Sequence, residues 1–104
     1  MTDYQYPPAR IFGTFTGSGQ TTGNFQMSPQ FSVSLGGSFS ATVLLERSPD
    51  GGTTWYPCST DATGTVAAYN APMSVDVVSA THGMVYRLRC TGFTSGTVNY
   101  DIWL

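Results

Sequence analysis

The sequence contains no lysine, one glutamate and one histidine, and only 10% of its residues are charged. The net charge is −2 and no basic run occurs, so the chain lacks the positive footprint that nucleic-acid binding requires. No apolar stretch reaches the length of about 18 residues that a transmembrane helix needs, and residues 1–8 lack the order of a signal peptide. We therefore expect a protein that binds neither nucleic acid nor membrane and is assembled in a cytoplasm.

The scarcity of charge also constrains the surface of the protein. Ser, Thr, Asn, Gln and Gly must form most of the polar surface. Charge depletion is typical of the core of a protein interface, and a free monomer usually carries more charge for solubility. Two explanations stay open: the chain is part of a larger assembly, or it has the composition bias of β-rich secreted or viral proteins.

Residues with catalytic chemistry are few and scattered. His82 stands in a predicted turn, and no G-x-S-x-G motif supplies a nucleophile for it. Glu46 falls within a predicted strand, so no pair of carboxylates for glycoside hydrolysis is evident. Asp50, Asp61 and Asp76 would hold calcium only if the fold happened to bring them together. We predict a protein that is not an enzyme and that needs no cofactor or metal.

The two cysteines, Cys58 and Cys90, are too few for a disulfide framework or a self-contained zinc site. Each falls in a predicted strand, where a cysteine can serve as a small buried apolar residue. The sequence leaves open whether the two are bridged, and a reducing compartment would disfavour a disulfide.

What the sequence does contain is alternation of apolar and polar residues with the period of a β-strand, with turn signals at regular intervals. We predict seven or eight strands in an all-β fold, an antiparallel two-sheet β-sandwich of the jelly-roll or immunoglobulin-like type. The predicted strands are 11–16, 30–35, 39–48, 53–58, 73–79, 84–90 and 97–103, with a short one around 23–27, a loop over 59–67 and a turn over 92–96.

Side-chain facing follows from the same alternation. Val43–Leu45 is apolar on both faces, which predicts a central strand. Arg87 and Arg89 fall on the face opposite to the apolar residues of their strand, and we expect one of them to meet Asp101 across a strand pair.

The length suits one domain, which we place at residues 11–104. Residues 1–10 contain a Pro pair and show no alternation. They are predicted to be either an extended arm that docks on a neighbouring protein or a frayed end. In the first case Tyr4, Tyr6 and Arg10 are the candidate partner contacts.

One motif is specific. Residues 48–55, SPDGGTTW, match the Asp-box pattern S-x-D-x-G-x-T-W at Ser48, Asp50, Gly52, Thr54 and Trp55. Asp50 in a tight turn can accept hydrogen bonds from backbone N–H groups, and glycine provides the positive φ of a hairpin loop. The aromatic ring of Trp55 can cover the turn. A single copy in a short chain predicts a structural hairpin and does not indicate a function.

A broader resemblance covers most of residues 38–102. A strand that leads into RSPDGGTTWYP, and a C-terminal VYRLRCTGFTSGTVNY, resemble small virion proteins of tailed bacteriophages. The resemblance implies a non-catalytic β-sandwich of the virion, most simply a capsid decoration or cement protein. Its partner would be the major capsid protein or another virion protein, and it would form a homo-oligomer such as a trimer. A place on the capsid or on the tail stays open.

An alternative function is a small carbohydrate-binding or host-surface adhesion domain, associated with a tail or fibre. It would use a platform of aromatic rings on one face. The rings available for such a platform are Tyr4, Tyr6, Trp55, Tyr56, Tyr69 and Trp103.

Overall fold

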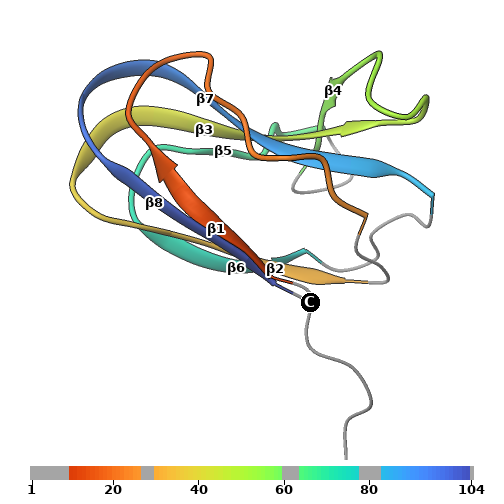
Figure 1. The fold of residues 1–104 in the computed structure, drawn as a ribbon, viewed down its shortest axis with the longest axis horizontal. Helices are drawn as coiled ribbons and strands as arrows, with labels where there is room; N and C mark the ends of the chain where they lie inside the picture. The colour runs from red at the N-terminus through yellow and green to blue at the C-terminus, as the bar shows by residue number, and fades with distance from the viewer. Residues whose placement is uncertain (1–9, 27–29, 60–63, 78–82, 104) are drawn as a thin grey trace, which may run out of the picture.

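The computed structural model describes residues 10–26, 30–59, 64–77 and 83–103 of the 104-residue chain. Within these ranges the chain forms eight strands and no helix, in two antiparallel sheets that pack face to face as a β-sandwich (Figure 1). None of the described segments forms a helix that is long and apolar enough to span a membrane. The strands are β1 (Arg10–Phe15), β2 (Phe31–Gly36), β3 (Phe39–Ser48), β4 (Tyr56–Pro57), β5 (Ala68–Tyr69), β6 (Met73–Val77), β7 (Val85–Gly96) and β8 (Val98–Trp103).

The first sheet has the strand order β1-β8-β2-β6. In the second sheet, β3 pairs with β4 and β5 on one side and with β7 on the other. Two isolated bridges, Thr21 to Arg89 and Phe25 to Tyr86, place residues 19–25 along the other edge of β7. Residues 19–25 therefore extend the second sheet beyond β7, although they do not form a regular strand.

The order of strands is that of a jelly roll. Each strand of the first sheet is joined along the chain to one element of the second sheet: β1 to residues 19–25, β8 to β7, β2 to β3 and β6 to β5. The joined elements lie in the same order in both sheets. An antiparallel ribbon thus folds over at one end of the sandwich, on the left of Figure 1. In an immunoglobulin sandwich, by contrast, consecutive strands such as A and B lie side by side in one sheet.

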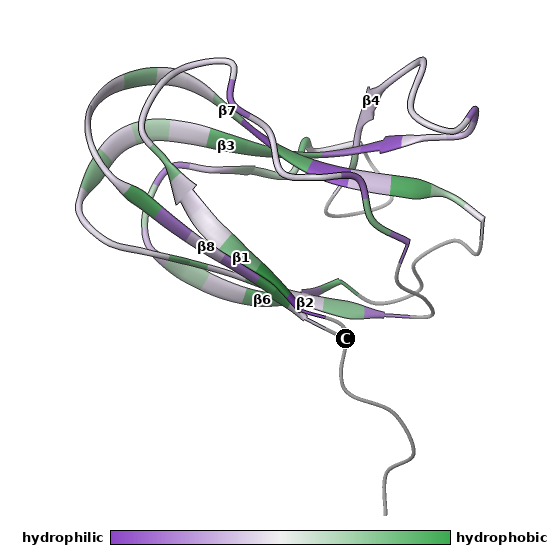
Figure 2. Ribbon diagram, viewed as in Figure 1, coloured by the Kyte–Doolittle hydropathy of each residue, from purple (hydrophilic) through white to green (hydrophobic). Residues whose placement is uncertain are grey.

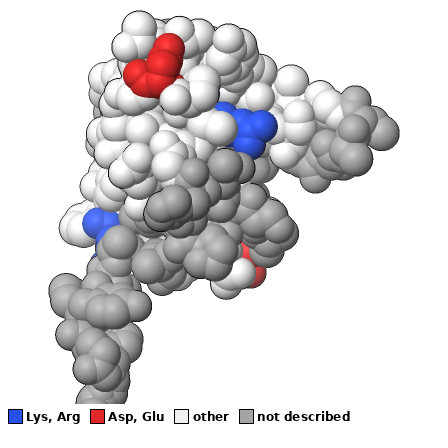
Figure 3. Space-filling model, turned by 90° about the vertical axis from the view of Figure 1, so that its right-hand side faces the viewer, with Lys and Arg blue, Asp and Glu red and all other residues white. Residues whose placement is uncertain are grey.

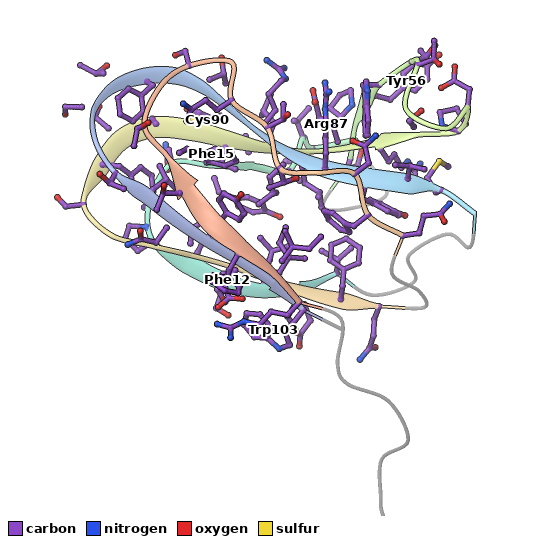
Figure 4. The ribbon with its side chains drawn as sticks, in the orientation of Figure 1. Phe12, Phe15, Tyr56, Arg87, Cys90 and Trp103 are labelled. Carbon is purple, nitrogen blue, oxygen red and sulfur yellow. The ribbon has the colours of Figure 1, made fainter. Side chains whose placement is uncertain are left out.

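The core lies between the sheets. It is built from inward-facing residues, which alternate with outward-facing ones along the strands (Figure 2). On β2 every second residue is buried, beginning with Phe31, and β3 continues the pattern with Val43 and Leu45. Phe15 and Cys90 point into the same space (Figure 4). Burying a large apolar side chain contributes about 1.5–3 kcal/mol, so this layer holds the two sheets together.

Two predictions made from the sequence for β7 and β4 are wrong in detail. Residues 92–96 do not form a separate turn, because β7 runs on to Gly96. The extra residues 92–94 of β7 form a bulge opposite Ala41, because the pairing of β3 with β7 shifts between Ser40 and Thr42. Gly92, within the bulge, has a φ of +59°. The hairpin strand predicted at 53–58 shortens to β4, because residues 49–54 form the turn.

Around residues 23–27 there is an isolated bridge at Phe25 and not a strand. The strand β5 follows the predicted loop and was not foreseen.

The predicted ion pair between Asp101 and Arg87 or Arg89 is also wrong. Asp101 lies on β8 in the first sheet, whereas both arginines lie on β7 in the second sheet. Their partner is Glu46 on β3, which stands opposite Arg87 in the register of the second sheet.

Candidate binding surface

The outward side of the first sheet carries the most exposed large hydrophobic residue among those described, Phe12. We call this side the outer face. The register places its residues in three rows that run across β1, β8, β2 and β6. The rows are Arg10, Trp103, Ser32 and Asp76; then Phe12, Asp101, Ser34 and Ser74; then Thr14, Asn99 and Gly36.

Phe12 is 67% exposed and stands in the middle row of the outer face. Figure 4 shows Phe12 and Trp103 on the same side of the first sheet, pointing away from the core. Phe12 lies there because Ile11, Gly13 and Phe15 alternate with it and face the opposite way. An exposed ring of this size on a sheet face is a candidate contact for a ligand or partner.

Arg10 and Asp101 flank Phe12 and neutralise each other. The guanidinium donates hydrogen bonds to both carboxylate oxygens, at 2.9 and 2.6 Å. These bonds hold the pKa of Asp101 below its ordinary value and raise the pKa of Arg10. The guanidinium carbon of Arg10 also lies 4.7 Å from the centroid of the Phe12 ring, within reach of a cation–π contact.

The far side of the outer face is a ladder of short polar side chains. The hydroxyl of Ser32 donates to Asp76 at 2.6 Å, and the hydroxyls of Ser34 and Ser74 are 2.7 Å apart. These cross-strand pairs tie β2 to β6. They present hydroxyl and carboxylate oxygens to solvent without any apolar bulk.

A shallow hollow of about 590 Å³ lies on the outer face beside Phe12. Thr14, Ser34, Gly36, Asn99 and Asp101 contribute to its lining. The hollow exists because Gly36 has no side chain in the row that it shares with Asn99. Its volume falls within the range of about 300–1,000 Å³ that is common for small-molecule sites.

The 48–55 turn lies on the second sheet, between β3 and β4. Asp50 Oδ1 accepts hydrogen bonds from the backbone N–H groups of Thr53 at 3.2 Å and Thr54 at 2.8 Å. The hydroxyl of Ser48 donates to the same oxygen at 2.6 Å and accepts from the N–H of Gly52 at 2.9 Å. Gly51 and Gly52 have φ values of +78° and +106°.

Hydrogen bonds within this turn shift the pKa of Asp50. The Ser48 hydroxyl, followed by Thr54 and Thr53, holds the pKa of Asp50 far below its ordinary value. Ser48 itself is completely buried. The hydrogen bonds of the Ser48 hydroxyl and of Asp50 Oδ1 are all made within the turn. The carboxylate of Asp50 therefore holds the backbone of the turn in its shape.

Trp55 connects the turn to the arginines of β7. Its indole N–H donates to the carbonyl of Gly52 at 3.0 Å, and the guanidinium of Arg87 lies 4.1 Å from the centroid of its ring. Arg87 and Arg89 both donate to Glu46, at 2.9 Å and 3.1–3.2 Å, and Glu46 is only 6% exposed. This partly buried charge cluster, of which Figure 4 labels Arg87, fastens the turn to the second sheet.

Tyr4, Tyr6, Asp61 and His82 lie outside the described residues. Arg10 is not part of a separate arm but begins β1.

Of the six rings considered for an aromatic platform, four are described. Trp55 and Tyr56 adjoin the second sheet, Tyr69 is half-buried on β5, and Trp103 is on the outer face of the first sheet. Thus these four do not form one platform.

Phe12 was missed from the sequence, although the signal was present. The strand RIFGTF places Arg10, Phe12 and Thr14 on the face opposite to Phe15. Which of the two faces is buried depends on Val98, Tyr100 and Ile102 of β8, far away in the sequence.

Ligands for metal chemistry are not gathered in the described ranges, which contain no group of three or more His, Cys, Asp or Glu side chains. Comparison of the chain with models of known protein families, with curated proteins and with solved structures finds no match.

Proposed function

We propose that this chain is a non-catalytic structural protein of a tailed-bacteriophage virion, most simply a decoration protein that binds the major capsid protein and stabilises the shell. The support from sequence is the resemblance of RSPDGGTTWYP and VYRLRCTGFTSGTVNY to virion proteins. The β-sandwich fold agrees with that class.

The observation that carries the proposal is that most charged side chains of the described residues are paired or hydrogen-bonded within the chain. Arg10 is paired with Asp101, and Arg87 and Arg89 are paired with Glu46. Asp50 and Asp76 accept hydrogen bonds from their neighbours. The described surface is mainly polar and carries few charges, of which Arg47 has no ion-pair partner among the described residues, and Figure 3 shows few charged residues on the face in view. Such a surface repels adjacent copies weakly, which suits a protein that is packed at high density on a symmetric assembly.

Attachment through β1 follows from its position. Among the described strands, β1 forms one edge of the first sheet, and residues 1–9 immediately precede it in the sequence. An edge strand offers unpaired backbone groups to a partner strand. We propose that Tyr4, Tyr6 and Arg10 contact the capsid protein next to this edge. Many copies bound in this way, with a trimer as one arrangement, would stabilise the shell by mass action and avidity.

Cryo-electron microscopy of purified particles tests this function. Hundreds of symmetric copies on the shell are the expected result; a few copies at the tail would keep the structural class and change the location. Absence from the particles would contradict the proposal. A second measurement adds purified protein to particles that lack it: Tyr4→Ala/Tyr6→Ala should bind more weakly than the unmodified chain, and Tyr56→Ala, on β4 of the other sheet, should bind equally.

A further inference from the structure

We propose that the outer face of the first sheet binds a neutral carbohydrate, with one sugar ring stacked on Phe12 and its hydroxyl groups bonded to Thr14 and Asn99. This inference does not depend on the proposed attachment to a capsid. It concerns the outer face of the first sheet, which shares only Arg10 with the residues proposed there as capsid contacts.

The aromatic part of the site is a single ring in a polar environment. Phe12 is 67% exposed, and its neighbours in the rows are Arg10, Thr14 and Asp101. A protein interface usually gathers several large apolar residues at its centre. Among the described residues of the outer face, the only other large ring is Trp103, which stands opposite Arg10 and does not line the hollow. A sugar ring has one apolar C–H side and a rim of hydroxyls, so it matches an isolated ring with a polar border.

The polar part of the site has hydrogen-bonding capacity to spare. Thr14 and Asn99 stand opposite each other in the register and are both exposed. Neither side chain makes a hydrogen bond to another described residue. A carboxamide can donate and accept at once, and a hydroxyl can do the same. This versatility suits a polyhydroxyl ligand.

The hollow beside Phe12 provides the space. Gly36 leaves the position next to Asn99 empty, and a Cβ placed on Gly36 would meet nothing within 4 Å. Ser34 and Asp101 form the adjacent row. The guanidinium of Arg10 lies over one face of Phe12. A sugar ring that stacks on the other face can extend over Gly36, where no side chain stands.

Charge selects the class of sugar. The two charged groups beside the hollow, Arg10 and Asp101, bind each other through two hydrogen bonds. The site thus offers no free positive group to an acidic sugar. A neutral hexose or N-acetylhexosamine unit is the ligand that this arrangement favours.

The test is a titration of the full chain with neutral oligosaccharides of glucose, galactose, mannose and N-acetylglucosamine, followed by amide NMR shifts. We expect at least one neutral sugar to shift the amides of Thr14, Asn99 and Gly36. Phe12→Ala and Asn99→Ala should weaken that binding by about tenfold or more, which corresponds to about 1.4 kcal/mol. Tyr56→Ala is the matched control, because Tyr56 is 55% exposed and lies on the second sheet.

Three results would overturn the inference. The first is the absence of shifts with every sugar at millimolar concentration. The second is equal weakening by Phe12→Ala and Tyr56→Ala. The third is stronger binding of a sialylated or uronic-acid oligosaccharide than of any neutral one. If no sugar binds and Phe12→Ala instead abolishes attachment to particles, the outer face is a protein interface. Thermal melting of each variant shows whether it is folded.

Discussion

The ring of Tyr100 lies across Gly13, its partner in the register of β1 and β8. A Cβ at position 13 would stand 2.6 Å from the hydroxyl oxygen of Tyr100 and 2.9 Å from its ring carbon Cζ. The same ring packs against Phe15, with centroids 4.7 Å apart. The missing side chain of Gly13 is therefore what leaves room for the ring of Tyr100 against β1.

Gly13→Ala should destabilise the protein by about 1–3 kcal/mol, because overpacking forces Tyr100 or the strand to move. Chemical denaturation measures the change. Gly36→Ala is the control, since Gly36 also lies in a strand but has open space around its Cβ position. It should be neutral or stabilising by up to about 1 kcal/mol. Equal destabilisation by the two substitutions would show that the contact with Tyr100 is not the cause.

Glu46→Gln should destabilise the protein by about 2–3 kcal/mol, because two arginines lose the charge of a partner that is almost fully buried. Asp101→Asn removes the acid of the exposed ion pair with Arg10 and should have a clearly smaller effect. Both are measured by urea unfolding at neutral pH. The expected ranking would be contradicted if Asp101→Asn were the more destabilising change.

Acid should weaken the 48–55 turn. The pKa of Asp50 is lowered in the folded state by the hydroxyl of Ser48 and by Thr54 and Thr53. The resulting stabilisation is present above the unfolded pKa of about 3.9 and is lost as the pH falls through the lower folded value. Asp50→Asn should therefore be less stable than the unmodified chain at pH 6, and the difference should shrink between about pH 4 and pH 2. A difference that stays constant with pH would contradict this role of the carboxylate.

Both cysteines should be unreactive in the folded protein. Cys58 and Cys90 are free and buried. Burial raises the pKa of Cys58 to about 11 and also raises the pKa of Cys90. Since the thiolate is the reactive form, alkylation by iodoacetamide at pH 8 should be slow, and denaturant should make both thiols reactive. Mass spectrometry follows the labelling; fast labelling of the folded chain would contradict the expectation.

Alternation predicted most of the fold because each strand carries its own period. β3 has the predicted bounds 39–48, and β2 and β8 differ from the predictions by one residue. The bulge at residues 92–94 of β7 and the two-residue strand β5 were not predictable in this way. Both exist because a long partner strand, β3, pairs with them, and their own sequences contain no strand period that could indicate it.

The candidate surface shows the same division. The sequence by itself determined the alternation of the strands, the sandwich, and the small set of charges available to the surface. Only the tertiary structure decided that Arg10 meets Asp101, 91 residues away, and that Arg87 meets Glu46. It also decided that Phe12 faces solvent while Phe15 is buried. The physical reason is that pairing in a sheet joins segments far apart in the chain, so the partner of a charge and the buried side of a strand depend on the neighbouring strand.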